Sequence, residues 1–417
     1  MRRLSGILRS AEKPVRVLRG VAWPAAVRER FFAAGERELP GVRYEPIDPG
    51  ASLAACAEVT REASGDSVLD AWLRRLARAI ATSARMMQAV GTAEFHTHSR
   101  ALYGDPTDPL PDRASHSLDL ARRLDDTLSR LSRADLGAPL PACHLASGVA
   151  QEMRKVVGDC FGDRAPEVEV VEDLSANCLA GPRRVRVRRS ACFTDLDVHQ
   201  LVHHELYVHV ATSLNGREQD DVPILAAGHA GTTRTQEGLA VFAEYITTHI
   251  DPSRFRRLAD RVLAIQMAIE GADFLEVYRY FLERTGGERE QSFENARRVF
   301  RGGVLTGSAP FTKDIVYLDG LTRVHNFLRV AVAAGRTDCI RLLFAGKLDI
   351  EDLPALCELA RLGLLREPSF VPPWIADLRH LVSHLAYAGF LGGIDLGKVA
   401  EHYDALLASA PLVSREP

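Results

Sequence analysis

The sequence predicts a mainly helical α+β protein with one small β-sheet. Apolar residues recur at helical spacing in many segments, most clearly at 68–90 and then repeatedly from Pro252 onward. Alternation with β-branched residues, which is typical of strands, is strong in only two short segments, 167–171 and 185–188. A chain of 417 residues can bury a sizeable core around such elements.

Changes in composition divide the chain into three expected parts. Small residues and prolines between Gly137 and Pro141 mark the entry to a central region, and short helical hairpins dominate after residue 337. We therefore expect an N-terminal helical region at 1–135, a core at 136–320 and a C-terminal helical region at 321–417.

The N-terminal region reads mainly as helices. Pro24 can open a helix through 28–34, and another helix resumes at 115–131 after a proline-containing loop. His96 and His98 have the spacing that places two side chains on one side of a strand, where they can share a metal ion. No third ligand is evident nearby in the sequence, so a structural role is favoured for this pair.

The central region opens with a short helix through 151–157, followed by the two strand-like segments. In the second segment Arg184, Arg186 and Arg188 alternate with Val185 and Val187. Because side chains alternate across a strand, the arginines would form a cationic stripe on one face. A solvated surface is the simplest role for such a stripe, and substrate binding is an equally weighted alternative.

Ionisable residues are concentrated in the next expected helix, which runs through His199 to about Ser213 with Asp195 or Asp197 as its cap. The segment reads His203-His204-Glu205-Leu206-Tyr207-Val208-His209 and is otherwise apolar, so we expect it to be buried. Ionisable side chains are rarely buried without partners. A bound metal explains them better than an ordinary amphipathic helix, although the latter is the commoner situation for a single histidine pair.

The spacing of the histidines constrains the helix. His204 and His209 are five residues apart and would diverge by about 140° on a regular α-helix. They converge only if the helix widens by one residue, as in a π-bulge. The sequence therefore predicts a π-type turn near Leu206 to Val208 if both imidazoles reach one metal.

A second acidic helix follows a loop at 216–235. We expect this helix at 236–248, with Glu237 on its first turn and Gly238 and Ala240 allowing close packing on the histidine helix. Glu244, two turns further on, can orient a histidine ligand through its free ring nitrogen. His229, in the loop, is interpreted as a surface residue rather than a contact of the site.

Four motifs carry a resemblance to a known family. H-E-L-Y-V-H and T-Q-E-G-L-A are followed by V-F-R-G-G at Val299–Gly303 and F-T-K-D-I-V-Y-L-D-G at Phe311–Gly320. In this order, over roughly residues 90–330, they resemble the QEGLA-motif family. Its bacterial members are labelled flavohemoglobin expression modulating, and its animal members are microtubule-associated tyrosine carboxypeptidases, which use an H-E-x-x-x-H zinc site to remove the terminal tyrosine of α-tubulin.

The resemblance implies a zincin-like metallopeptidase core that binds Zn2+. It implies His204, His209 and Glu237 as metal ligands and Glu205 as the catalytic base. It does not transfer the tubulin substrate. Zinc peptidases of this kind commonly bind peptide along an edge strand, so the strand at 183–189, with Arg186, is the expected platform and would favour acidic substrates.

The two later motifs contain further candidates for substrate binding. Arg298 and Arg301 flank Phe300, and Lys313 and Tyr317 lie in the last motif. A guanidinium can bind a carboxylate through two hydrogen bonds, and lysine or tyrosine can donate to a developing oxyanion. For each residue alone a structural salt bridge is an equally good interpretation.

The amino-acid composition limits the kinds of binding partner that we expect. Lysine and arginine total 52 against 55 acidic residues, a net charge of −3, so neither nucleic acid nor a membrane is an expected partner. The 7 cysteines are scattered without a C-x-x-C pair, and no apolar run is long enough for a membrane span. Reduced thiols suit a cytoplasmic location.

The combined prediction is a zinc metallopeptidase, by resemblance a carboxypeptidase that removes a C-terminal residue from a peptide or protein tail. Two alternatives stay open from the sequence. One is a regulatory binding protein with a structural zinc site, and the other is a zinc amidohydrolase that acts on a non-peptide amide.

Overall fold

The computed structural model describes residues 1–45, 47–131, 144–172, 174, 176–395, 399 and 403–404. Helices predominate over short strands in these residues, which confirms the mainly helical α+β class. The chain forms two compact units, Met1–Pro372 and Pro373–Pro417. The boundary predicted near 320 falls within a helix of the first unit, and the one near 135 lies outside the described residues.

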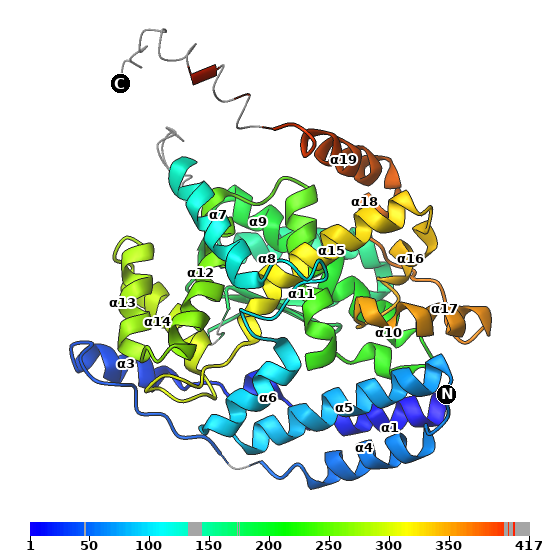
Figure 1. Cartoon of the computed structure of the whole chain (residues 1–417), viewed down its shortest axis with the longest axis horizontal. Helices are drawn as coiled ribbons and strands as arrows, with labels where there is room; N and C mark the ends of the chain where they lie inside the picture. The colour runs from blue at the N-terminus through cyan, green and yellow to red at the C-terminus, as the bar shows by residue number, and fades with distance from the viewer. Residues whose placement is uncertain are drawn as a thin grey trace. The chain divides into compact units, whose positions relative to one another are not determined.

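In the described residues, seven helices precede the first strand. Three of them, α1, α4 and α5, lie side by side (Figure 1). The amphipathic segment predicted at 68–90 forms α5, whose N-terminus is capped by Ser67. The bounds are α1 (Arg2–Glu12), α2 (Val17–Gly20), α3 (Ala25–Ala33), α4 (Gly50–Glu62), α5 (Val68–Gln88), α6 (Ala93–Tyr103) and α7 (Ser117–Leu131).

The strand expected around His96 and His98 is wrong, since both residues lie in α6. Two residues span about 200° of an α-helix, so the imidazoles point apart and cannot share a metal ion. The Nδ1 atom of His96 instead lies 2.7 Å from the carbonyl oxygen of Pro310. His96 therefore has a structural role, as the sequence favours.

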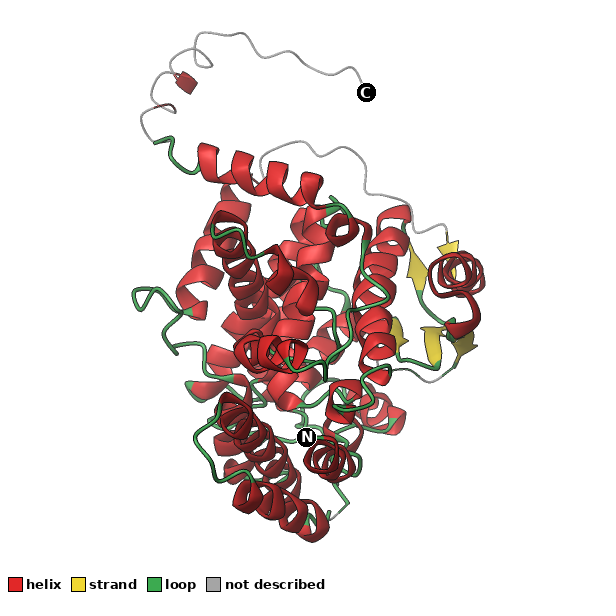
Figure 2. Cartoon of the chain, turned by 90° about the vertical axis from the view of Figure 1, so that its right-hand side faces the viewer, coloured by secondary structure: helices red, strands yellow, loops and turns green. Residues whose placement is uncertain are grey.

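The strands gather on one flank of the helices (Figure 2). A three-stranded sheet has the order β2-β4-β3, with β2 parallel and β3 antiparallel to β4, and β1 pairs with β5 in a two-stranded sheet. Helix α8 and a 3₁₀ turn η1 connect β1 to β2. The bounds are β1 (His144–Leu145), α8 (Ala146–Phe161), η1 (Gly162–Arg164), β2 (Glu167–Val171), β3 (Cys178–Ala180), β4 (Arg184–Arg188) and β5 (Cys192–Phe193).

Strand β4 alternates as predicted but is not an edge strand. Val185 and Val187 are fully buried, and the arginines point to the other face. Because β4 lies between β2 and β3, its backbone is already paired and cannot receive a peptide. Glutamates of β2 stand opposite the arginines, and Arg184 lies 3.4 Å from Glu169, which partly neutralises the stripe. The alternation of residue types correctly predicted which side chains share a face of β4, but it could not predict which strands pair with β4.

The histidine motif lies in one continuous helical stretch. Thr194 and Asp197 form a capping box at its start, so the cap is Thr194 rather than either aspartate. Helix α11 begins six residues earlier than expected because His229, which is buried, caps it with its side chain. The elements are α9 (Asp195–Leu201), the π-helix η2 (Val202–Val210), α10 (Ala211–Arg217), the 3₁₀ turn η3 (Pro223–Ala226) and α11 (Ala230–Ile246).

The remaining elements are helical, as predicted. In the first unit they are α12 (Pro252–Ile269), α13 (Phe274–Arg284), α14 (Arg289–Phe300), the 3₁₀ turn η4 (Lys313–Ile315), α15 (Val316–Ala333), α16 (Thr337–Leu342), the 3₁₀ turn η5 (Ile350–Asp352) and α17 (Leu353–Arg361). The second unit contains α18 (Pro373–Ala376) and α19 (Leu378–Leu391). None of the described helices combines the length and apolarity needed to cross a membrane.

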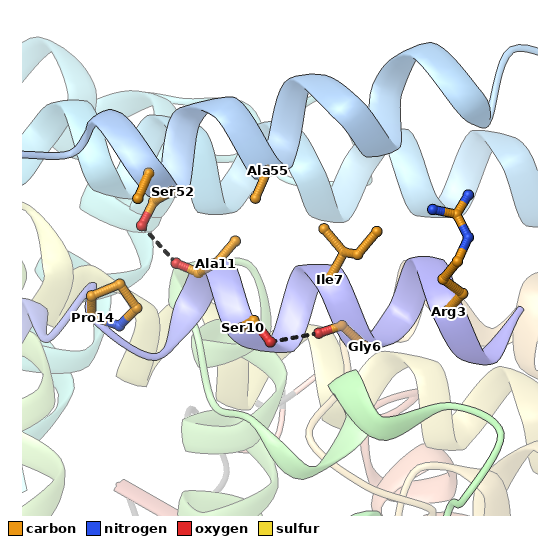
Figure 3. Close-up of a pocket in the computed structure, with 9 residues that line it drawn as sticks. Arg3, Gly6, Ile7, Ser10, Ala11, Pro14, Ser52 and Ala55 are labelled. Carbon is orange, nitrogen blue, oxygen red and sulfur yellow. Dashed lines mark hydrogen bonds between the residues drawn. The ribbon is translucent and has the colours of Figure 1, made fainter.

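A cavity of about 440 Å³ lies between α1 and α4. Figure 3 shows Ser52 of α4 donating to the carbonyl of Ala11 in α1 at one end of it. Its lining is largely apolar and includes none of the residues that the sequence singles out for metal or substrate binding. The candidate site is elsewhere in the first unit.

Helix α11 packs against η2 on one side and α15 on another, and glycines make the second contact possible. A Cβ atom at Gly238 would lie 2.3 Å from the carbonyl oxygen of Gly320, which is backbone and cannot move aside. The two motifs that contain these glycines are thereby brought into direct contact.

We predict that Gly238→Ala destabilises the protein by about 1–3 kcal/mol or more, because overpacking forces the two helices apart. Urea unfolding measures the change. Gly148→Ala is the matched control, since a Cβ at Gly148 in α8 meets nothing within 4 Å. That change should be neutral or stabilise by up to about 1 kcal/mol. Equal stability of the two variants would contradict the close contact.

Candidate metal centre

The helix between His204 and His209 is widened. Residues Val202–Val210 form a π-helix, which confirms the backbone predicted from the five-residue spacing. The two imidazole centroids are 5.0 Å apart. Leu206 and Val210 belong to the buried cluster that includes the sheet valines, so they anchor the opposite side of the helix. The widening thus allows the apolar side chains to stay in the core while the two histidines converge on the other side of the helix.

Glu237 completes a compact set of donors. Its Oε2 atom lies 3.7 Å from Nε2 of His204 and 3.8 Å from Nε2 of His209. These separations exceed a hydrogen bond but suit donors that each lie about 2 Å from one central ion. Because α11 begins at Ala230, Glu237 is in its third turn rather than its first. Two imidazoles and a carboxylate are a common ligand set for catalytic zinc.

Glu244 holds His204 from behind. Its Oε1 atom lies 2.7 Å from Nδ1 of His204, the contact expected from its position two turns beyond Glu237. Arg254 donates two hydrogen bonds of 2.9 Å to the same carboxylate, which is fully buried. With Nδ1 donating to Glu244, Nε2 of His204 is free to bind a metal. Burial opposes protonation, but Glu244 outweighs it and raises the pKa of His204.

Glu205 lies between the donor set and the edge of the three-stranded sheet. It is buried, and its Oε2 atom accepts a hydrogen bond of 3.1 Å from the backbone N–H of Ala180 in β3. Strand β3, not β4, is therefore the edge strand next to the histidine helix. The N–H bond fixes one carboxylate oxygen of Glu205 and leaves the other available.

Lys313 connects Glu237 to the residues of the last motif. Its ammonium is 3.4 Å from Oε1 of Glu237 and 5.0 Å from the ring centroid of Tyr317. Burial alone would raise the pKa of Glu237, but Lys313 and then His209 hold it well below its usual range. Glu237 is accordingly ionised and able to act as a metal ligand at neutral pH.

Arginines surround Tyr317 on its other side. Arg298 donates to the Tyr317 hydroxyl at 3.3 Å and pairs with Asp314. The Arg261 guanidinium lies 4.5 Å from the Tyr317 ring centroid and 3.9 Å from Asp314. Arg261 was not anticipated because it occupies an ordinary amphipathic helix, α12, outside the four motifs. Its separation of seven residues, about two helical turns, from Arg254 is the one signal in the sequence that the two arginines share a face.

This region, which we call the cationic cluster (Arg261, Arg298, Arg301, Lys313 and Asp314), contains more positive than negative charge. Arg301 is buried, and its Nε atom, like Nη1 of Arg261, has no hydrogen-bond partner among the described residues. Burial, followed by repulsion from Arg298, lowers the pKa of both Arg261 and Arg301 to about 10. Buried donors of this kind, which have no hydrogen-bond partner, can bind an anion.

Arg186 is not brought to this site. Val185 and Val187 pack into the cluster that contains Leu206 of η2, so Arg186 points to the opposite face of the sheet. The structure therefore unites Arg298, Arg301, Lys313 and Tyr317 near the donor set and leaves Arg186 apart.

A second group of metal-type donors lies between α16 and α17. The donor atoms of Asp338, Cys339 and Cys357 are close together, but Nη2 of Arg336 lies 3.0 Å from the Cys339 sulfur and 2.8 Å from Asp338. A guanidinium already takes the place of a cation there. At the His204, His209 and Glu237 set, the Lys313 ammonium lies 3.4 Å from Oε1 of Glu237, whereas Oε2 is the atom that faces the two histidines.

We predict that Glu244→Gln destabilises the metal-free protein by about 3 kcal/mol at neutral pH, because Arg254 and His204 lose their buried anion. The folded protein lowers the pKa of Glu244 from 4.5 to about 2. Its contribution is therefore complete above pH 4.5 and is lost as the pH falls toward 2. Urea unfolding with a chelator at several pH values should show the two proteins converging in acid. Glu358→Gln, in an exposed ion pair, should change little at any pH.

Comparison with known proteins agrees with the motifs. Residues 29–393 match the family model described as microtubule-associated tyrosine carboxypeptidase. No curated protein matches the chain. Because the family match includes all four motifs and far more than half of the residues, the chain belongs to the microtubule-associated tyrosine carboxypeptidase family.

Proposed function

We propose that this protein is a zinc-dependent metallopeptidase with a zincin-like core that removes a residue from the C-terminus of a peptide or protein tail. Family membership supports a carboxypeptidase-like activity on protein tails. The observation that carries the zinc proposal is the convergence of His204 Nε2, His209 Nε2 and Glu237 Oε2 on the widened helix. These residues would hold the metal, and Glu244 would orient His204.

Zinc, when bound there, supplies a Lewis acid that makes water nucleophilic near neutral pH and polarises a carbonyl group. The chain supplies the proton transfers. Glu205 takes the proton from water through the carboxylate oxygen that Ala180 does not occupy. It then passes that proton to the amine that leaves. Burial of Glu205 within the first unit keeps bulk water from competing for the proton.

Strand β3 replaces β4 as the proposed platform for the substrate backbone. It is a sheet edge, it packs on η2, and the N–H of Ala180 points from it to Glu205. An extended peptide along this edge would make main-chain hydrogen bonds with groups of β3 other than the Ala180 N–H, which already donates to Glu205, and would bring a peptide carbonyl to the donor set. The neutralised stripe on β4 gives no support for a preference for acidic tails, which remains a prediction from the sequence.

The cationic cluster is the proposed site for the terminal carboxylate of the substrate. A buried carboxylate needs fixed cations or several donors to offset its desolvation. Lys313 lies 3.4 Å from Glu237, and Lys313 and Arg298 both contact Tyr317. Arg301 and Arg261 each add a buried nitrogen that has no hydrogen-bond partner among the described residues. This arrangement favours an exopeptidase over an amidohydrolase that acts on a neutral small amide.

We predict that the purified protein carries about one zinc per chain, and that His204→Ala, His209→Ala or Glu237→Ala each loses most of it. Glu205→Gln should retain zinc and lose peptidase activity. Elemental analysis and a peptide cleavage assay measure the two properties. Full zinc in His209→Ala would contradict the ligand assignment, and unchanged activity in Glu205→Gln would contradict the role of the base. Zinc without hydrolysis of any peptide would favour the regulatory alternative.

We also predict that amidating the C-terminus of a peptide lowers its cleavage by about 10²-fold, the effect of removing a charged partner from a buried pair. The Arg301→Gln variant should cleave the free-acid peptide more slowly, so that the cleavage rates of the free-acid and amidated peptides differ less. Arg279→Gln, on the exposed side of α13, is the control and should behave like the unmodified protein. Mass spectrometry that finds internal cuts, or equal cleavage of both peptides, would indicate an endopeptidase.

A further inference from the structure

A lysine from outside the four motifs reaches the back of the metal centre. Lys347 lies between α16 and α17 and is half-buried. It donates hydrogen bonds of 3.0 Å to the carbonyl oxygen of His209 and of 3.0 Å to Oε1 of Gln236. His209 is on η2, and Gln236 directly precedes Glu237 on α11. One ammonium thus bridges the two helices that present the proposed ligands.

Several hydrogen bonds hold the segment that contains Lys347 in place. Asn215 and Gln219 donate to the carbonyls of Phe344 and Ala345 at 2.8 and 3.3 Å. The backbone N–H of Lys347 donates to the carbonyl of Leu225 at 2.7 Å. At Gly346 a Cβ atom would lie 2.7 Å from that same carbonyl oxygen, so only glycine allows the approach. The position of Lys347 is therefore fixed before any ligand binds.

The acceptors of Lys347 belong to a wider network on the widened helix. The Thr212 hydroxyl lies 2.6 Å from the carbonyl oxygen of Val208 and 2.9 Å from Gln236 Oε1, and it can donate its one proton to either acceptor. Ser213 donates to the carbonyl of His209 at 2.6 Å. These side chains donate hydrogen bonds to carbonyls of the π-helix, where the regular i to i+4 hydrogen bonds of an α-helix are not made.

The charge of Lys347 makes its position informative. Both of its acceptors are neutral, and no carboxylate lies within ion-pair distance of it among the described residues. An ammonium that is partly withdrawn from water without an ionic partner is unfavourable for stability alone. Burial lowers the pKa of Lys347 to about 8, and the charges of Glu237 and then Glu205 oppose that shift. If Lys347 only filled space, an apolar residue of similar size could take its place without loss of stability.

We propose that Lys347 is a positioning residue that fixes the placement of η2 relative to α11 and thereby sets the geometry and affinity of the metal centre. The inference rests on the proposed zinc site and assigns to it a determinant from outside the motifs. Lys347 does not contact substrate in this account. It acts through the backbone of His209 and the side chain of Gln236.

The test compares zinc affinity and geometry in full-length variants. Lys347→Met keeps the aliphatic stem and removes the donors, and should weaken zinc binding by about 10–100-fold in a chelator competition. It should also shift the visible absorption of the cobalt(II)-substituted protein, because the ligand angles change. Lys155→Met, exposed on α8, is the matched control and should change neither property. Urea unfolding of the metal-free proteins checks that both variants fold.

The outcomes separate this inference from the proposed function. If the unaltered protein binds no zinc, the proposed function fails and this inference fails with it. If it binds zinc and Lys347→Met has the same affinity and cobalt spectrum, only the role of Lys347 is overturned. If metal-free Lys347→Met is unfolded, Gln236→Met decides, because it removes one end of the bridge and retains the ammonium. Weaker zinc binding in that variant supports the proposal, and unchanged binding overturns it.

Discussion

The site depends on the widening of one helical segment, Val202–Val210. Without the π-type widening of Val202–Val210, the imidazoles of His204 and His209 would point in different directions and Glu237 would face only one of them. A widened turn weakens the regular hydrogen bonding of the helix, so it persists only where surrounding contacts determine it. Buried apolar packing on one side and hydrogen bonds from Thr212, Ser213 and Lys347 on the other provide those contacts.

Sequence spacing was sufficient for features that depend on local geometry. The five-residue separation of the histidines predicted the π-helix, and the seven-residue separation of Glu237 and Glu244 placed both on one face of α11. Strand alternation likewise identified the buried valines of β4. Each of these inferences needs only the period of one element, which the chain itself specifies.

Features that depend on neighbours were missed or misassigned. Alternation in β4 could not reveal that β2 and β3 lie on either side of it, so the edge strand was assigned to the wrong segment. His96 and His98 fit a strand as well as a helix until the capping and packing of α6 are known. Arg261 and Lys347 lie far from the motifs and join the site only through packing of α12 and of the segment before α17. Long-range packing of this kind leaves no periodic signal in a single sequence.

The uneven charge of the cationic cluster has a consequence for turnover. A single residue released from a C-terminus keeps its carboxylate and gains an ammonium where the peptide bond was cut. In the proposed arrangement the cluster would attract the first group, and the ammonium of Lys313, which lies 3.4 Å from Oε1 of Glu237, would repel the second. In the proposed reaction, the fixed charges that would hold the uncut tail would therefore hold the released amino acid less favourably, because the product carries a new positive charge.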